Sequence, residues 1–168
     1  MLINKITFKT LLSTLVLLPM LLTTPTTLAH DDAHHKHDGP QLKQTLFNRL
    51  GGLAAISVVV DDFIDKVVSD AQLNKNPNIN AARKRVATPY LKYQVTSMVC
   101  LATGGPCKYT GRSMKESHQK MRIKESEWAR MIVLFKEVLA KHRVGKAETE
   151  MLLSVINSTK ADIVMPSM

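Results

Sequence analysis

The residues whose chemistry stands out in this chain are its six histidines, because a neutral imidazole nitrogen is a common metal ligand. Four of them lie close together near the N-terminus: His30, His34, His35 and His37. Acidic residues at 31, 32 and 38 are interspersed with them. This segment is a candidate site for copper or zinc. The alternative is a solvated tail without a specific site, because a bound metal would first have to order it.

The other two histidines, His118 and His142, fall in the part of the chain that is helical by period. His118 follows the sequence SMKE at 113–116, a capping-box pattern that predicts a short helix. Met114 and Met121 are expected on the same face of this helix as His118. One imidazole in an apolar slot commonly holds haem iron, although a lone helical histidine is also compatible with an ordinary hydrogen-bonded role. His142, near a helix end, is expected to be solvated or to stabilise the helix dipole.

Apolar residues recur at three- and four-residue steps along most of the chain, which is the period of amphipathic helices. A short first helix is expected to end at the Gly-Gly pair at 51–52, and the next stripe runs over residues 53–67. Residues 71–80 are rich in asparagine and contain Pro77, which predicts a loop, with Asn80 capping a short basic segment after it. No strand-like alternation of any length is present, so the expected fold class is all-α.

Three further stretches predict helices in the second half of the chain. Thr88-Pro89 is a start signal, with threonine at the cap and proline in the first turn. That helix is expected to end before the GGP sequence at 104–106, and a long connection then leads to His118. Apolar stripes over residues 128–142 and 151–156 predict the last two helices.

The N-terminus has the features of a secretory signal peptide over residues 1–29. Two lysines precede a short apolar run at 11–22, and the sequence TLA at 27–29 predicts cleavage after Ala29. The run is shorter than the ~20 residues of a membrane-spanning helix, so we expect no membrane anchor after cleavage. The expected organisation is a signal peptide (1–29), a disordered histidine-rich tail (30–41) and a folded domain (42–168), exported to the periplasm or secreted.

Charge and cysteines narrow the function classes further. The mature chain keeps 21 of the 23 basic residues and all 14 acidic ones, so its net charge is +7 with neutral histidines. These basic residues are scattered over helix faces with few aromatics among them, which argues against nucleic-acid binding. Cys100 and Cys107 form either a short-loop disulfide in an oxidising compartment or two unrelated thiols. Their spacing excludes both a thioredoxin-like site and covalent c-type haem.

Read together in chain order, six short sequences resemble the group 1 truncated globins. They are LFNRLGG at 46–52, DDF at 61–63, GGP at 104–106, YTGRSM at 109–114, His118, and KADIV at 160–164. The run from GGP to the histidine is the specific part, because amphipathic helices occur in many proteins. The resemblance covers residues 42–164, nearly all of the mature chain.

The resemblance implies a two-over-two helical sandwich around non-covalent haem b, with His118 as the proximal iron ligand and Met114 beside it. It implies a protein that binds O₂, NO or CO reversibly, with an electron donor that the sequence does not identify. Because turnover of NO would need that reductant, we expect no enzyme. The alternatives are a metal-handling protein that uses the tail histidines and a helical binding module without a cofactor.

The distal side departs from the family pattern. The position after Phe63, where oxygen-binding members usually have tyrosine, is Ile64. Leu91 and Val95 fall at the two distal-facing positions of the next helix if no gap is introduced, whereas a one-residue gap would bring in Gln94. Tyr90 and Tyr93 are expected on other faces of that helix. An apolar pocket of Ile64, Leu91 and Val95 predicts loose O₂ binding, because bound O₂ would lack a hydrogen bond worth about 1–3 kcal/mol.

Overall fold

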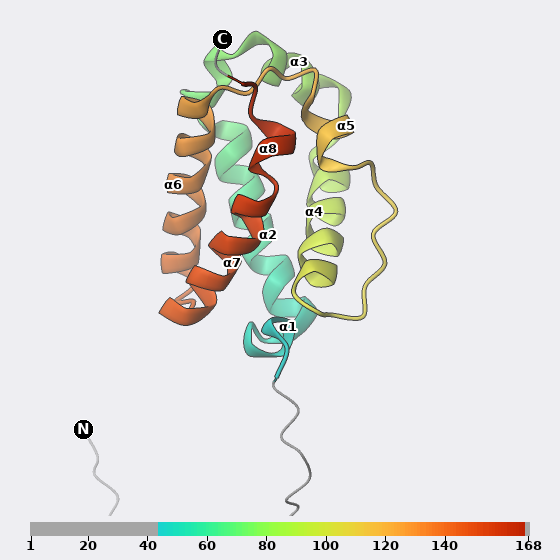
Figure 1. The fold of residues 1–168 in the computed structure, drawn as a ribbon, viewed down its shortest axis with the longest axis vertical. Helices are drawn as coiled ribbons and strands as arrows, with labels where there is room; N and C mark the ends of the chain where they lie inside the picture. Colours follow the sequence, from blue (N-terminus) through green and yellow to red (C-terminus); the bar gives the residue numbers. More distant parts are fainter. Residues whose placement is uncertain (1–43, 167–168) are drawn as a thin grey trace, which may run out of the picture. The chain divides into compact units, whose positions relative to one another are not determined.

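The computed structural model describes residues 44–166, and Figure 1 shows their arrangement. The elements are α1 (Leu46–Arg49), α2 (Gly52–Ser69), the 3₁₀ turn η1 (Leu73–Lys75), α3 (Pro77–Arg85), α4 (Thr88–Ala102), α5 (Met114–His118), α6 (Glu125–Lys141), α7 (Lys146–Ser158) and α8 (Lys160–Ile163). Residues 44–166 contain no strand, only an isolated bridge between Ile123 and Val164. The predicted all-α class is confirmed. None of the helices described here has the length and apolar character needed to cross a membrane.

The centre of the fold is the long helix α2, which packs most extensively against α4 and next against α6. Its apolar stripe buries Ile56, Val60 and Ile64. Facing residues of α4 that pack against this stripe are Leu91, Val95 and Val99. The three- and four-residue spacing of the sequence is therefore the direct cause of this contact, because it places these side chains on one face of each helix.

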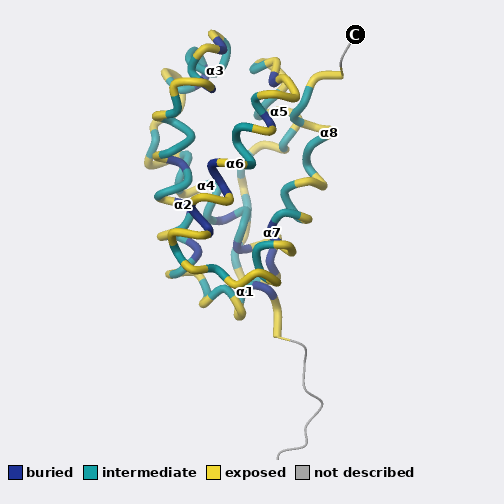
Figure 2. The backbone as a smooth tube through the Cα atoms, turned by 90° about the vertical axis from the view of Figure 1, so that its left-hand side faces the viewer, coloured by how far each residue is buried: buried dark blue, intermediate teal, exposed yellow. Residues whose placement is uncertain are grey.

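A second apolar cluster joins α6 and α7 to the start of the chain. Leu46 of α1, Phe135 and Leu139 of α6, and Leu152 of α7 are its buried members. The dark segments in Figure 2 mark such buried positions along the inner sides of the helices. Phe63 of α2 meets Phe135 edge-on, with 5.1 Å between ring centroids, and so links the two clusters.

The turn between α1 and α2 needs glycine. Gly51 has a φ of 90°, a left-handed conformation that residues with a Cβ rarely adopt. At the other glycine pair, the requirement at Gly105 is space: a Cβ there would lie 2.5 Å from the Phe47 ring and 2.7 Å from the Cys100 sulfur. The backbone can therefore approach α1 and α4 closely only because residue 105 has no side chain.

Residues 71–80 do not form the predicted loop. A 3₁₀ turn forms at Leu73–Lys75, and α3 begins at Pro77, whose fixed φ suits the first turn of a helix. The cap is Asn76, not Asn80: the Asn76 side chain accepts hydrogen bonds from the amides of Asn78 and Ile79. Asparagine and proline are common in loops, which is the basis of the loop prediction. Here Asn76 caps the helix and Pro77 begins it.

The predicted helix starts are right at α5 and partly wrong at α4. The capping box at Ser113 is present, because its side chain accepts from the Glu116 amide while Glu116 accepts from the Ser113 amide. At α4, Pro89 lies in the first turn as predicted, but the cap is Ala87 and Thr88 is already helical. The Thr88 hydroxyl is therefore not needed to start the helix.

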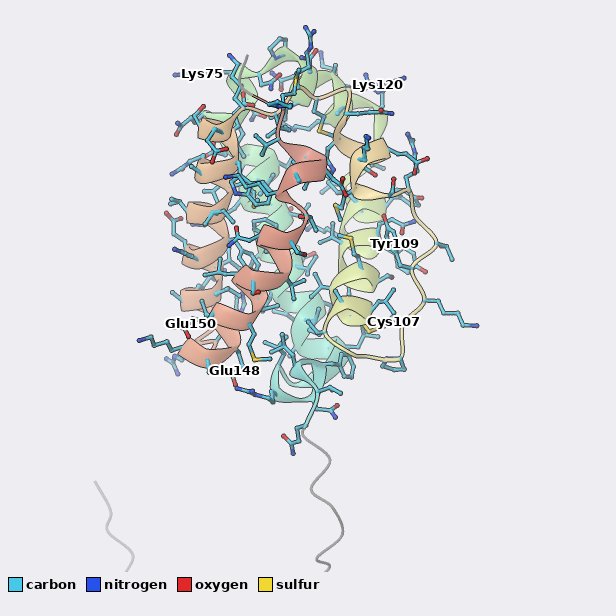
Figure 3. All side chains as sticks on the ribbon, viewed as in Figure 1. Lys75, Cys107, Tyr109, Lys120, Glu148 and Glu150 are labelled. Carbon is cyan, nitrogen blue, oxygen red and sulfur yellow. A yellow bond between two sulfur atoms is a disulfide. The ribbon has the colours of Figure 1, made fainter. Side chains whose placement is uncertain are left out.

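The sulfur atoms of Cys100 and Cys107 are joined in the structure. Cys100 is completely buried near the end of α4, and Cys107 lies in the long connection that leads to α5. Figure 3 shows this connection running along the outside of α4 past Cys107 and Tyr109. The bond ties the start of the connection to α4, and the Tyr109 hydroxyl donates to the Arg112 carbonyl at 2.7 Å near its end.

Candidate functional site

A cavity of about 1160 Å³ lies between the helices. Side chains from α2, α4 and α6 form much of its wall, and they are mostly apolar or aromatic: Val60, Phe63, Val67, Met98, Val99, Trp128, Met131 and Phe135. Its volume is slightly above the ~300–1,000 Å³ that is usual for ligand sites. A well-packed helical protein leaves few voids larger than a water molecule, so a cavity of this size indicates a large apolar ligand.

All five residues that the sequence assigned to the cofactor line this one cavity. Ile64 comes from α2, Leu91 and Val95 from α4, and Met114 and His118 from α5. The structure thus brings together side chains that are up to 54 positions apart in the sequence. Their meeting depends on the packing of α2 on α4 and on the connection that returns the chain to α5.

His118 is the last residue of α5 and is half-buried. Its ring Nδ1 lies 2.9 Å from the carbonyl oxygen of Met114, one helical turn earlier. A carbonyl oxygen only accepts hydrogen bonds, so Nδ1 carries the proton and donates it. In the neutral ring the lone pair is then on Nε2, the state in which imidazole binds a metal.

The surroundings of His118 favour that neutral state. Burial lowers the pKa of His118 below its usual value of 6.5, and the hydrogen bond to the Met114 carbonyl only partly opposes this effect. Met114 and Met121 both line the cavity with His118, as their spacing predicted, although Met121 lies in the turn after α5. A neutral imidazole whose tautomer is fixed by a hydrogen bond is the form that a metal-binding histidine requires.

The part of the cavity wall that α4 forms contains a polar side chain, Gln94, among apolar ones. The sequence offered either Leu91 and Val95 or, with a one-residue gap, Gln94 as distal residues. All three line the cavity. The Gln94 amide nitrogen donates to the Tyr90 hydroxyl at 2.8 Å, while its buried Oε1 has no hydrogen-bond partner among the described residues. Tyr90 also lines the cavity although it is more than half exposed, and Tyr93 is exposed and does not line it.

Positive charge gathers on the elements around the cavity. Residues 71–124 contain eleven of the 23 lysines and arginines but only one of the 14 acidic residues, Glu116. Five of these basic residues line the cavity: Arg83, Lys84, Arg85, Arg112 and Lys120. Within the described part of the chain, none of these five forms an ion pair. Figure 3 places Lys120 at the end of the molecule where α5 ends.

His142 lies away from the cavity and has a structural role. It caps the C-terminus of α6, and its Nε2 lies 2.5 Å from a carboxylate oxygen of Asp62 on α2. Lys141 bonds the same oxygen, and these two contacts, with Lys141 the larger cause, lower the pKa of Asp62. The prediction of a merely solvated or dipole-stabilising histidine missed this link between α6 and α2.

The four tail histidines, His30, His34, His35 and His37, lie outside the described residues. Within residues 44–166, no group of three or more histidine, cysteine, aspartate or glutamate side chains could hold a metal ion. His118 is therefore a lone candidate ligand in this part of the chain, which suits a metal whose other ligands come from a cofactor.

Sequence reasoning missed several wall residues, among them Met98, Trp128 and Met131. Their helical spacing was recognised, but it indicates only that a side chain faces inward. Whether an inward side chain fills the core or borders a cavity depends on the separation of two helices, which no local pattern contains.

We expect the stability of the haem-free protein to reveal the depressed pKa of His118. As the pH falls through 6.5, the unfolded chain takes up a proton before the folded chain does. The contribution of neutral His118 to the free energy of unfolding is therefore complete above pH 6.5 and is lost as the pH falls toward the folded-state pKa. Denaturant unfolding should show a steeper loss between about pH 7 and pH 5 in the wild type than in His118→Gln. Equal slopes would contradict this assignment, as would an NMR titration midpoint of His118 at or above 6.5.

The chain matches the family model of the bacterial-like globins over residues 45–165. A group 1 truncated hemoglobin of Tetrahymena pyriformis is 27% identical over 123 residues, which cover 71% of this chain and 94% of that protein. The group 1 truncated hemoglobin GlbN of Mycolicibacterium paratuberculosis is 35% identical over 78 residues, or 45% of this chain and 51% of that protein.

Solved structures agree with this result. The Fe(III) form of truncated hemoglobin from Tetrahymena pyriformis superposes with a TM-score of 0.64 at 25% identity, covering 73% of this chain and all of that one. The 2/2 hemoglobin of Synechococcus, a structure with covalently attached heme, has a TM-score of 0.63 at 20% identity and shows the shared fold alone. With helices, cavity and relatives in agreement, the chain belongs to the bacterial-like globin family, and the resemblance to group 1 truncated globins indicated by the sequence is confirmed.

Proposed function

We propose that the protein binds haem b in the cavity, with iron held by His118, and that it reversibly binds a diatomic gas there. The observation that supports this most strongly is the set of features at His118. They are a half-buried ring, an Nδ1 that donates to the Met114 carbonyl, and an Nε2 left free to bind a metal beside an apolar cavity. Haem iron in the ferrous state supplies the gas-binding chemistry.

The residues present fit the group. The cavity offers a wide apolar space for the macrocycle, and its basic residues suit the two propionates. Two buried side-chain atoms in residues 44–166 lack a hydrogen-bond partner, Nε of Arg83 and Oε1 of Gln94, and both residues line this cavity. Buried polar atoms are usually satisfied. Nε of Arg83 is a donor that an anionic ligand would complete, whereas Oε1 of Gln94 only accepts and is completed if the amide is turned so that its oxygen accepts from the Tyr90 hydroxyl.

The basic residues would contribute through charge. Arg112, Arg83 and Lys84 line the cavity and are candidate partners of the propionates. Five basic residues but only two acidic ones, Glu116 and Glu127, line the cavity, so its net charge is positive and it attracts anions. An anionic ligand is thereby favoured over a neutral one of the same shape.

Gln94 supplies the hydrogen-bond donor that the predicted apolar distal pocket lacks. An amide nitrogen can donate to a bound O₂, and Gln94 is held near the cavity by Tyr90. Exchanging the oxygen and nitrogen positions of this amide keeps the Tyr90 contact, because the hydroxyl can also donate. We therefore expect O₂ to be held more tightly than a pocket of Ile64, Leu91 and Val95 alone would allow.

The proposed role is gas binding and not turnover, with O₂, NO and CO as possible ligands. Turnover of NO would need an electron donor, and the donor is unidentified. The observations at His118 concern ligand binding, which a carrier, a sensor and a scavenger all share.

Haem titration tests the proposal. We expect one haem b per chain and a Soret band that is lost or strongly shifted in His118→Ala, because the variant has no proximal imidazole. His142→Ala is the matched control, since His142 bonds Asp62 away from the cavity. It should keep the spectrum while lowering stability. The same Soret band in wild type and His118→Ala would reject the assignment.

Stopped-flow measurement of O₂ release tests the role of Gln94. Gln94→Leu should release O₂ about tenfold faster than the wild type, because one hydrogen bond in a dry pocket is worth about 1–3 kcal/mol. CO release should change much less, since bound CO depends little on a distal donor. Tyr93→Phe is the control, as Tyr93 does not line the cavity. An unchanged O₂ rate in Gln94→Leu would mean that the distal side is functionally apolar.

Export and the disulfide belong to one further proposal. We propose that residues 1–29 are cleaved and that the bridge between Cys100 and Cys107 forms in the oxidising compartment that the protein then enters. Protein recovered from the exported fraction should begin at His30 and contain no free thiol. An intact N-terminus or two reactive thiols would contradict it.

A further inference from the structure

Asn76 lies where three segments meet, at the end of the molecule that contains α3 and the end of α5 (Figure 1). It is only 7% exposed, which is unusual for asparagine. No motif in the sequence marks it as part of the cofactor site, and it does not line the cavity. Its side chain nevertheless makes four hydrogen bonds that use both ends of the amide.

The oxygen end of the Asn76 amide caps α3. Oδ1 accepts from the amide of Asn78 at 2.9 Å and from that of Ile79 at 3.4 Å. This is an ordinary N-cap, which a serine or aspartate at the same position would also provide. It explains the start of α3 but not why the residue is asparagine.

The nitrogen end reaches the chain that follows His118. Nδ2 donates to the carbonyl oxygen of Met121 at 3.1 Å and to a carboxylate oxygen of Glu127 at 3.1 Å. The Met121 amide in turn donates to the carbonyl oxygen of His118 at 2.8 Å. Two hydrogen bonds through one residue therefore connect Asn76 to the backbone of the proposed iron ligand.

The connection from α5 to α6 is held on its other side as well. The Met165 amide donates to the Ile123 carbonyl at 2.9 Å, which joins the connection to the segment after α8. Between these two anchors, Arg122 has a φ of 53°, a left-handed conformation that is unfavourable for arginine. Such a conformation persists where the surroundings fix the backbone, so the two anchors define the path of the connection.

We propose that Asn76 is a positioning residue for His118. Its amide nitrogen holds the Met121 carbonyl and so sets where the end of α5 lies relative to α3 and the cavity. This inference rests on the proposed function, because it assigns the anchored segment to the support of an iron ligand. The two ends of the Asn76 side chain thus have different roles. The amide oxygen caps α3, and the amide nitrogen positions the segment that follows His118.

Two substitutions isolate the nitrogen end. Asn76→Ser and Asn76→Asp both keep an oxygen to cap α3, but neither can donate to Met121 as the amide does. Asn76→Asp also sets a second carboxylate against Glu127. The matched control is His142→Ala, which removes the link from His142 to Asp62 away from the cavity while it leaves the Asn76–Met121 bond.

The first measurement is amide hydrogen exchange in the haem-free protein. In Asn76→Ser the Met121 amide should exchange about tenfold faster, because its hydrogen bond to the His118 carbonyl opens more often once the neighbouring Met121 carbonyl is no longer anchored. The Asn78 and Ile79 amides should remain protected by the serine cap. His142→Ala should lower the melting temperature without changing exchange at Met121.

The second measurement uses the haem-loaded protein. Asn76→Ser and Asn76→Asp should lose haem about tenfold faster than the wild type and should shift or broaden the iron–histidine stretching band in the ferrous Raman spectrum. His142→Ala should keep both properties. Proximal changes of the same size in His142→Ala would overturn the proposal in favour of general destabilisation, and so would unchanged exchange at Met121 in Asn76→Ser. If the wild type binds no haem, the proposed function fails, whereas the exchange result still decides whether Asn76 anchors the segment.

Discussion

The constraint on which this structure depends is that a small helical protein must keep a large apolar cavity open. A cavity of about 1160 Å³ leaves its lining side chains without packing partners on one side, which forfeits dispersion energy. The helices must therefore be held in place by interactions around the cavity. Between α2 and α6 these include the contact of Phe63 with Phe135, which both line the cavity, and the ion pair of Arg130 with Asp70 at 2.7 Å near the end of α2.

Acidic and basic residues have different places in this structure. Around the walls the acidic residues are used to join helices, as with Asp62 and His142 or Glu148 and Arg49. Among the residues that line the cavity, five are basic and two, Glu116 and Glu127, are acidic, and the five basic residues form no ion pair in residues 44–166. An apolar space with cationic borders recognises a flat apolar molecule that carries carboxylates, because each part of such a ligand meets its complement.

Much of the fold could be predicted from the sequence because helical periodicity and caps are local signals. The capping box at Ser113 and the assignment of Ile64, Leu91, Val95, Met114 and His118 to one site depended on such signals and on the family pattern. Asn76 and Pro77 show the limit of such local signals, because asparagine and proline are common both at helix starts and in loops. The roles of Gln94 and His142 depended on partners in space, which one-dimensional patterns do not contain.

Chemical rescue of the proximal ligand tests the central claim most directly. His118→Ala should bind haem weakly and with an altered Soret band. Free imidazole, which can enter the space left by the ring, should restore the iron–imidazole spectrum of the wild type in a saturable way. A variant whose spectrum equals that of the wild type without imidazole would contradict the claim that His118 holds the iron, as would one that imidazole leaves unchanged.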